Sequence, residues 1–172
     1  MRRLTSYFVF ISFLSLSWAA LAQQSSPTAT ATCNFDADKQ LAAEYQRIAV
    51  NAKRPPLGRE IPYGKVWAPG GKPITLFTNT PVEIGGANLA VGAYTMYVIP
   101  TTKQWTLIIS KSTDTSGKYD EKMDLVRVPM ESGELSAPES QLEVSFGHIA
   151  PDQCNLRLEL ATTGAWAVFQ KR

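Results

Sequence analysis

Residues 154–160 read Cys-Asn-Leu-Arg-Leu-Glu-Leu, a strict alternation of apolar and polar side chains. Successive side chains of a β-strand point to opposite faces, so this pattern predicts a strand with one face in a core and the other in water. Cys154 shares the parity of the three leucines, and its sulfur is therefore expected on the buried face.

The same two-residue period recurs along most of the chain, in segments 74–79, 94–99, 105–110, 125–128, 142–146 and 166–169. Turn signals separate the segments. The clearest is Ile84-Gly85-Gly86-Ala87, whose two glycines suit a two-residue hairpin turn. Strands spaced about ten residues apart, without a long helical segment, predict an all-β fold. We expect an antiparallel β-sandwich of about 8–10 strands, with a jelly-roll-like or barrel-like arrangement as the variant.

One segment fits two structures. Asp36 could cap a helix in which Leu41, Tyr45 and Ile48 recur at helical spacing. The same residues could form a strand that follows a turn at 36–39. Periodicity alone leaves the two alternatives open.

The N-terminus has the pattern of a secretory signal peptide. Arg2 and Arg3 precede an apolar run over 7–16, and Ala20-Leu21-Ala22 supplies the small residues that signal peptidase requires. We expect cleavage between Ala22 and Gln23, a periplasmic or secreted location, and no membrane span once residues 1–22 are removed. Residues 23–32 are small or polar and predict a flexible leader, followed by a single β-sandwich domain over 33–172.

Charge argues against nucleic acid as a partner. The full chain has 17 basic and 15 acidic residues, and two of the basic residues, Arg2 and Arg3, belong to the predicted signal peptide. The exported protein would be close to neutral, whereas nucleic-acid binding needs a net basic face.

The only two cysteines, Cys33 and Cys154, predict a disulfide, because an exported chain meets an oxidising environment. The bridge would close a loop of roughly 120 residues and stabilise the fold by about 4–5 kcal/mol in the chain-entropy model. No Cys-x-x-Cys pair points to a redox role.

The stretch 54–71 concentrates prolines and glycines around charged and aromatic side chains. Such a loop can present cations and flat rings together, as sites for sugars, carboxylates or peptide ends do. We expect a ligand site here, with cationic anchors, aromatic platforms and one acidic group: Arg59, Lys65, Tyr63, Trp67 and Glu60. The competing interpretation is structural, with Arg59 in an ion pair and Trp67 as a plug for one end of the sandwich.

These motifs resemble a bacterial family, the domain of unknown function numbered 2911. The likeness spans about 33–150 and is most specific in Gly58-Arg59-Glu60-Ile61 and in Pro-Tyr-Gly-Lys-Val-Trp at 62–67. The resemblance implies an exported all-β domain, favours a strand for the ambiguous segment, and implies no activity. Relatives usually have several extra residues between these two blocks. They also continue with Arg-Thr-Gly-Ala-Asn-Glu after the tryptophan, where this chain has Ala-Pro-Gly-Gly-Lys-Pro at 68–73.

Other candidate chemistry is weaker. His148 is the single histidine, at the end of a predicted strand and on its apolar parity, which favours a structural role. Four acidic residues between 114 and 124 are interleaved with lysines and match no calcium loop.

We expect no catalytic residues, no metal site and no cofactor. The leading hypothesis is a non-catalytic envelope or secreted domain that binds a small molecule or glycan. The alternatives are a structural module that docks an envelope protein, and a hydrolase that uses His148 with a carboxylate.

Overall fold

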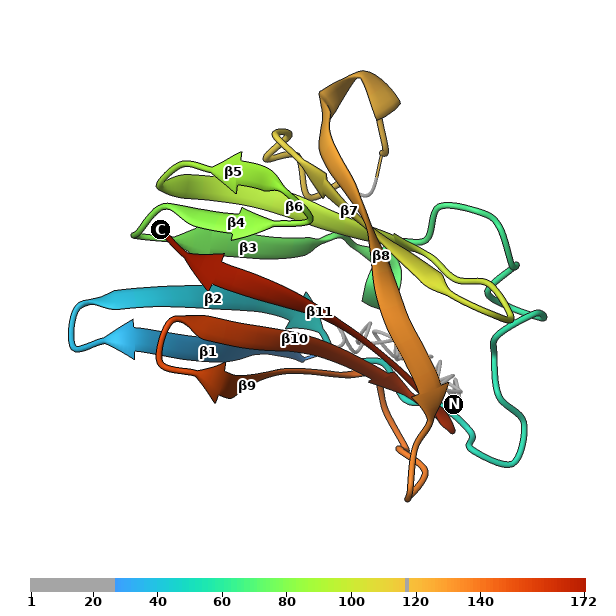
Figure 1. Cartoon of the computed structure of the whole chain (residues 1–172). Helices are drawn as coiled ribbons and strands as arrows, with labels where there is room; N and C mark the ends of the chain where they lie inside the picture. Colours follow the sequence, from blue (N-terminus) through green and yellow to red (C-terminus); the bar gives the residue numbers. More distant parts are fainter. Residues whose placement is uncertain (1–26, 117) are drawn as a thin grey trace, which may run out of the picture.

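The computed structural model describes residues 27–116 and 118–172, and this part of the chain is built almost entirely from antiparallel strands (Figure 1). The strands run in the order β1-β2-β3-β6-β7-β8-β11-β10-β9, and the short hairpin β4-β5 is attached to the end of β11. Their bounds are β1 Thr28–Asp36, β2 Lys39–Gln46, β3 Ile74–Thr78, β4 Val82–Ile84, β5 Ala87–Leu89, β6 Gly92–Ile99, β7 Trp105–Ser110, β8 Asp124–Glu134, β9 Glu143–Ala150, β10 Gln153–Leu160 and β11 Thr163–Lys171.

Strand β8 joins the two layers of the fold. One layer contains β1, β2, β3, β6 and β7, and the other contains β11, β10 and β9 with the hairpin β4-β5. Its first half pairs with β7, from Asp124 opposite Ser110 to Met130 opposite Trp105. Its second half pairs with β11, from Glu131 opposite Trp166 to Glu134 opposite Thr163. In Figure 1 this long strand runs steeply from the upper layer to the lower one. The all-β prediction is confirmed, and of its variants the barrel-like one describes the molecule best, because one eleven-stranded sheet curls round until it nearly closes.

Local predictions from the sequence hold well. The ambiguous segment is the strand β2, after a turn at 37–38, as the family resemblance implied. The hairpin β4-β5 turns at Gly85 and Gly86, with φ angles of 56° and 81°, which matches the two-residue turn that needs two left-handed residues.

The N-terminal boundary differs from the prediction. The predicted flexible leader extends to residue 32, whereas β1 begins at Thr28 and pairs with β2 from that residue onward. Residues 28–32 alternate Thr and Ala, and Thr favours strands. Composition alone made this segment look unstructured, because it lacks large apolar residues, and only its long-range pairing reveals the strand. The predicted signal peptide and cleavage point, Ala22 and Gln23, lie outside the described residues.

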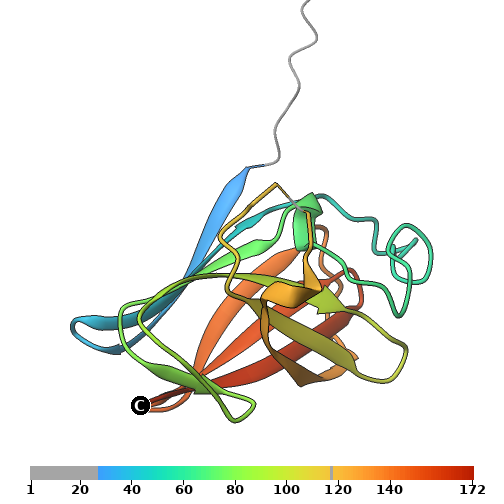
Figure 2. The ribbon, with the colours of Figure 1, turned by 90° about the horizontal axis from the view of Figure 1, so that it is seen from above.

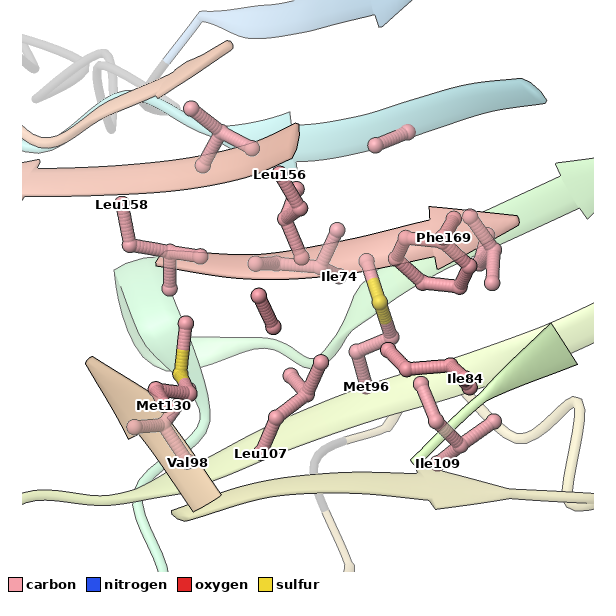
Figure 3. Packing of buried hydrophobic residues seen from close by; sticks show 14 of the residues in the cluster. Ile74, Ile84, Met96, Val98, Leu107, Ile109, Met130, Leu156, Leu158 and Phe169 are labelled. Carbon is pink, nitrogen blue, oxygen red and sulfur yellow. The ribbon is translucent and has the colours of Figure 1, made fainter. Parts of the chain in front are cut away.

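The core fills the space between the two layers (Figure 3). Side chains from β6 and β7, such as Met96 and Leu107, face side chains from β10 and β11, such as Leu158 and Phe169, and all four are fully buried. The leucines of the 154–160 stretch lie in this core together with Cys154, as their shared parity predicted. Burial of this many large side chains on a chain of this size supplies most of the favourable free energy of folding.

Two edge strands, β1 and β9, meet where the curled sheet closes, and we call this line of contact the seam. At one end of the seam the backbone continues the sheet, since the Val50 amide donates to the Ser140 carbonyl (2.8 Å) and the Leu142 amide to the Ile48 carbonyl (2.8 Å). The Arg47 guanidinium also reaches across to the Glu143 carboxylate at 2.7 Å. These bonds satisfy backbone groups that an open sheet edge would expose.

The disulfide crosses the seam nearer its other end. Cys33 on β1 bonds to Cys154 on β10, with 6.4 Å between their Cα atoms, and both residues are buried. The predicted pairing is confirmed. At the same end, the Lys171 ammonium donates to Asp36 at 2.7 Å, and this contact lowers the pKa of the Asp36 carboxyl. Within the described residues, no helix has the length and apolar character needed to cross a membrane.

A long connection, residues 47–73 between β2 and β3, covers the end of the barrel opposite the C-terminus, and we call it the end loop. It is the teal and green segment that projects to the right in Figures 1 and 2. The Trp67 amide donates to the Val98 carbonyl (2.7 Å), and the Val98 amide donates back to Trp67 (3.0 Å). The Gly64 amide donates to the Pro100 carbonyl (2.8 Å). The end loop is therefore fastened to β6 as an added piece of sheet.

A second connection, between β7 and β8 and described over 111–116 and 118–123, covers part of the outer surface. Beneath it Tyr97 is buried, and the rings of Tyr97 and Tyr119 meet edge to face with their centroids 5.1 Å apart. The Tyr119 hydroxyl donates to Asp124 (2.6 Å) and accepts from Arg127 (2.8 Å). Burial, and secondarily the bond to the Asp124 carboxylate, raises the pKa of Tyr119 to about 12.

We expect the double variant Cys33→Ala, Cys154→Ala to fold but to lose about 2–5 kcal/mol of unfolding free energy, since the bridge restricts the unfolded chain over a separation of 121 residues. Urea unfolding of both proteins, followed by circular dichroism, measures the difference. Equal midpoints would mean that the seam is held by its other contacts alone.

Gly70 and Gly71 form a matched pair for testing how the end loop joins β2. Both have a left-handed φ, 84° and 86°, but an added Cβ at Gly70 would lie 2.4 Å from the Gln46 carbonyl oxygen, whereas at Gly71 it meets open space. We expect Gly71→Ala to cost about 1–2 kcal/mol from backbone strain alone. Gly70→Ala should cost clearly more, and equal losses in urea unfolding would contradict this packing.

The raised pKa of Tyr119 predicts a loss of stability at alkaline pH. The fold favours the neutral phenol, so its contribution is complete below pH 10 and declines as the pH rises toward about 12. The difference in unfolding free energy between the wild-type protein and Tyr119→Phe should therefore shrink over this interval. Denaturant unfolding at several pH values tests it, and two parallel pH profiles would show that the phenol titrates normally.

Candidate functional site

The end loop is held in one shape by its own backbone. The Pro56 carbonyl accepts from the amides of both Arg59 (3.1 Å) and Ile61 (3.0 Å), and the Gly58 amide donates to the Ile61 carbonyl (2.8 Å). Gly58 has a φ of 76°, the left-handed conformation that glycine adopts most easily. These bonds close a compact turn over 56–61, so the backbone positions from which its side chains project are fixed.

A pocket of about 440 Å³ lies between this turn and the segment that follows β2. We call it the end-loop pocket. Its walls are mainly apolar, and Ile61 and Trp67 contribute buried or partly buried surface. The lining residues are Ile48, Ala49, Val50, Asn51, Arg54, Pro56, Glu60, Ile61 and Trp67. This volume and composition fall in the range usual for small-molecule sites.

Two opposite charges belong to the end-loop pocket. The Arg54 guanidinium lies 3.8 Å from the Glu60 carboxylate, and the two side chains are 62% and 58% exposed. An exposed pair at this distance is weak, so either group can exchange its partner for a ligand at little cost. The Arg54 guanidinium can bind a carboxylate through two parallel hydrogen bonds.

Trp67 connects the pocket to the core. Its ring meets the Trp105 ring edge to face, with centroids 6.5 Å apart, and Trp105 is buried. The backbone pairing with Val98 fixes the residue as well. Trp67 therefore offers a wall of defined orientation, which lowers the entropic cost of binding a ligand against it.

Tyr63 lies in a different place. Its ring covers Gly58, where an added Cβ would come within 2.6 Å of Tyr63 Cε2. It lines a neighbouring pocket of about 200 Å³ together with Leu57, Lys103 and Trp105. Of the five residues predicted for the ligand site, Glu60 and Trp67 thus share the end-loop pocket, while Tyr63 belongs to the adjacent one. Arg59 and Lys65 are exposed and line neither of these two pockets.

Several residues of the end-loop pocket are not evident as site residues from the sequence. Arg54 stands in the same unusual stretch as Arg59, and nothing in the linear order distinguishes which arginine faces the pocket. Ile48 and Val50 follow β2, and their apolar character is a usable signal, but it points to core packing as readily as to a ligand wall. The pairing of this segment with 140–142, through the Ala49–Gln141 bridge and the backbone bonds of Ile48 and Val50, places it at the site.

The remaining candidates lie elsewhere. His148 is exposed on β9, and its Nδ1 atom lies 3.5 Å from the Ala150 carbonyl oxygen. Among the described residues, none of the ion pairs joins this ring to a carboxylate. In the acidic segment, Glu121 and Asp124 bind Arg127 at 2.8 and 2.9 Å, and Asp120 accepts from the Lys122 amide. These contacts agree with a structural role for that segment.

Comparison with known proteins places the chain in a family and goes no further. A search of curated proteins finds no match, and a search of solved structures finds none either. The model of the family described as "Protein of unknown function (DUF2911)" matches residues 26–167, which includes all of the end loop and ten of the strands in full. The chain therefore belongs to the DUF2911 family, as the motifs at 58–67 indicated.

Proposed function

We propose that this protein is a non-catalytic binding domain that takes up a small amphipathic molecule in the end-loop pocket. The observation that carries the proposal is the combination of a mainly apolar pocket of about 440 Å³ with a single loosely paired arginine, Arg54. Apolar walls favour an apolar body, and one available cation favours a single anionic group. A short aryl or alkyl chain that ends in a carboxylate has this chemistry.

The way the pocket is built supports a binding role. Its floor is fastened to β6 through Trp67, and its wall is fastened to the lead-in of β9 through the segment 48–50. A pocket that is already formed avoids the ordering cost that a flexible loop would pay on binding. In contrast, no pair of an acid and a base at hydrogen-bonding distance stands out among the residues that line it.

The proposal includes an exported location, periplasmic or secreted. The disulfide is the supporting observation, because such bonds persist in oxidising compartments and are rare in reducing ones. The proposal also keeps Tyr63 and Lys65 as candidates for an outer part of the site, since both are exposed on the end loop.

The test uses three related probes: 4-phenylbutyrate, its neutral amide, and acetate. We expect 4-phenylbutyrate to bind most tightly, with shifts of backbone NMR signals confined to the end loop and the lead-in of β9. Arg54→Gln should weaken the carboxylate about five- to tenfold and leave the amide nearly unchanged, since one charge-assisted contact is lost. Trp67→Leu should weaken both aromatic probes by a similar factor.

Arg59→Gln is the matched control, because it removes an exposed arginine of the same loop that does not line the pocket. It should bind all three probes as the wild-type protein does. Loss of binding in Arg59→Gln but not in Arg54→Gln would move the anchor to Arg59 and refute the pocket assignment. Absence of any shift with all three probes would refute the amphipathic ligand class.

A further inference from the structure

A second cluster of ligand-type side chains lies on the seam, away from the end loop. Cys33 on β1, Cys154 on β10 and His148 on β9 bring two sulfurs and one imidazole nitrogen within 4.8 Å of one another. Cys154 and His148 are direct cross-strand partners. Three different strands therefore supply the three groups, and the closure of the barrel positions them.

The spacing suits a metal ion once the sulfurs are no longer bonded to each other. In a tetrahedral zinc site with bonds of about 2.3 Å to sulfur and about 2.0–2.1 Å to nitrogen, the ligand atoms lie roughly 3.5–3.8 Å apart. The Cα atoms of the two cysteines are 6.4 Å apart, so rotation of their side chains is enough to open this gap. Two thiolates and one imidazole form a donor set that favours Zn²⁺ and other thiophilic ions.

The surroundings suit an ion as well. Cys33 and Cys154 are only 3% and 0% exposed, whereas His148 is exposed. A thiolate without a counter-charge would be costly in this dry position, and a bound cation removes the cost. The exposed imidazole leaves a path from solvent and a fourth coordination position for water. The Ala150 carbonyl, 3.5 Å from His148 Nδ1, is the kind of backbone partner that orients a metal-bound histidine.

We propose that the reduced chain binds one thiophilic cation, Zn²⁺ or an ion of similar chemistry, through Cys33, Cys154 and His148. The two cysteines then have two alternative states, a metal-free disulfide and a metal dithiolate. The inference is independent of ligand binding in the end-loop pocket.

The conversion between these states balances with a dithiol reductant. The reductant gives two electrons and two protons to the Cys33–Cys154 bond, which becomes two thiols, and the reductant becomes a disulfide. The cation then displaces the two thiol protons to solvent, and two metal–sulfur bonds and one metal–nitrogen bond form. Oxidation by a disulfide oxidant reverses the sequence and releases the ion.

Co²⁺ is the probe, because its bonds to thiolates give a sulfur-to-metal charge-transfer absorption. The whole exported chain is reduced with a phosphine under anaerobic conditions and titrated with Co²⁺, then with competing Zn²⁺. We expect one Co²⁺ per reduced chain, none per oxidised chain, and a retained β-sheet circular dichroism spectrum. Zn²⁺ should displace Co²⁺ and raise the melting temperature of the reduced chain.

Two variants separate the proposed site from adventitious binding. His148→Ala leaves the disulfide and the core in place and should weaken Co²⁺ binding to the reduced chain by about tenfold or more. Ile149→Ala is the control, since this neighbouring side chain is 53% exposed and has no atom that can bind a metal ion, and it should bind as the wild-type protein does. Equal affinity in wild-type and His148→Ala chains would overturn the proposal. So would the absence of a charge-transfer band, or a reduced chain that loses its sheet and does not regain it with the ion.

Discussion

Closure of the seam is the constraint on which the rest of this structure depends. A sheet that curls round exposes two long edges, and each edge carries unpaired backbone groups that cost free energy or recruit other chains. Here β1 and β9 meet instead. Backbone hydrogen bonds between 48–50 and 140–142 close one part of the line, and the bond from Cys33 to Cys154 closes another. Together these contacts keep the core residues between the two layers buried.

The same closure creates the environment of the candidate site. Segment 48–50, which forms the backbone hydrogen bonds across the seam, is also a wall of the end-loop pocket. The opposite part of the end loop is fastened to β6 at Trp67, so the pocket spans two anchored elements. Its shape therefore follows both from these two anchors and from the turn at 56–61, which the backbone of the loop itself closes.

Much of the fold can be predicted from the sequence because strand patterning is local. The alternation at 154–160 identifies a strand, its buried face and the direction of Cys154, and two consecutive glycines identify the hairpin at 85–86. Local patterning does not indicate which strands, distant in the sequence, pair with each other at the edges of the sheet. The strand at 28–32 is not evident from the sequence for this reason, since Thr and Ala carry little hydrophobic signal and only pairing with β2 orders them. Choosing between Arg54 and Arg59 fails for the same reason, because both stand in one loop and only its folded path separates them.

Substitutions at the pocket end of the seam and substitutions near the disulfide should have independent effects on stability. From Glu143, at the pocket end of β9, to His148 the strand advances by roughly 16 Å, given about 3.3 Å per residue. This separation exceeds the reach of a direct side-chain contact, and effects at such separations usually add. A change in the state of the cysteines can reach the pocket through a shift of β9 or of β2, which pairs with β1 and leads into the pocket wall at 48–50. The ion pair from Arg47 to Glu143 and the paired backbone of 140–142 oppose such a shift. The two parts of the seam thus stabilise the same barrel. One part lies beside the end-loop pocket, and the other contains the Cys33, Cys154 and His148 cluster.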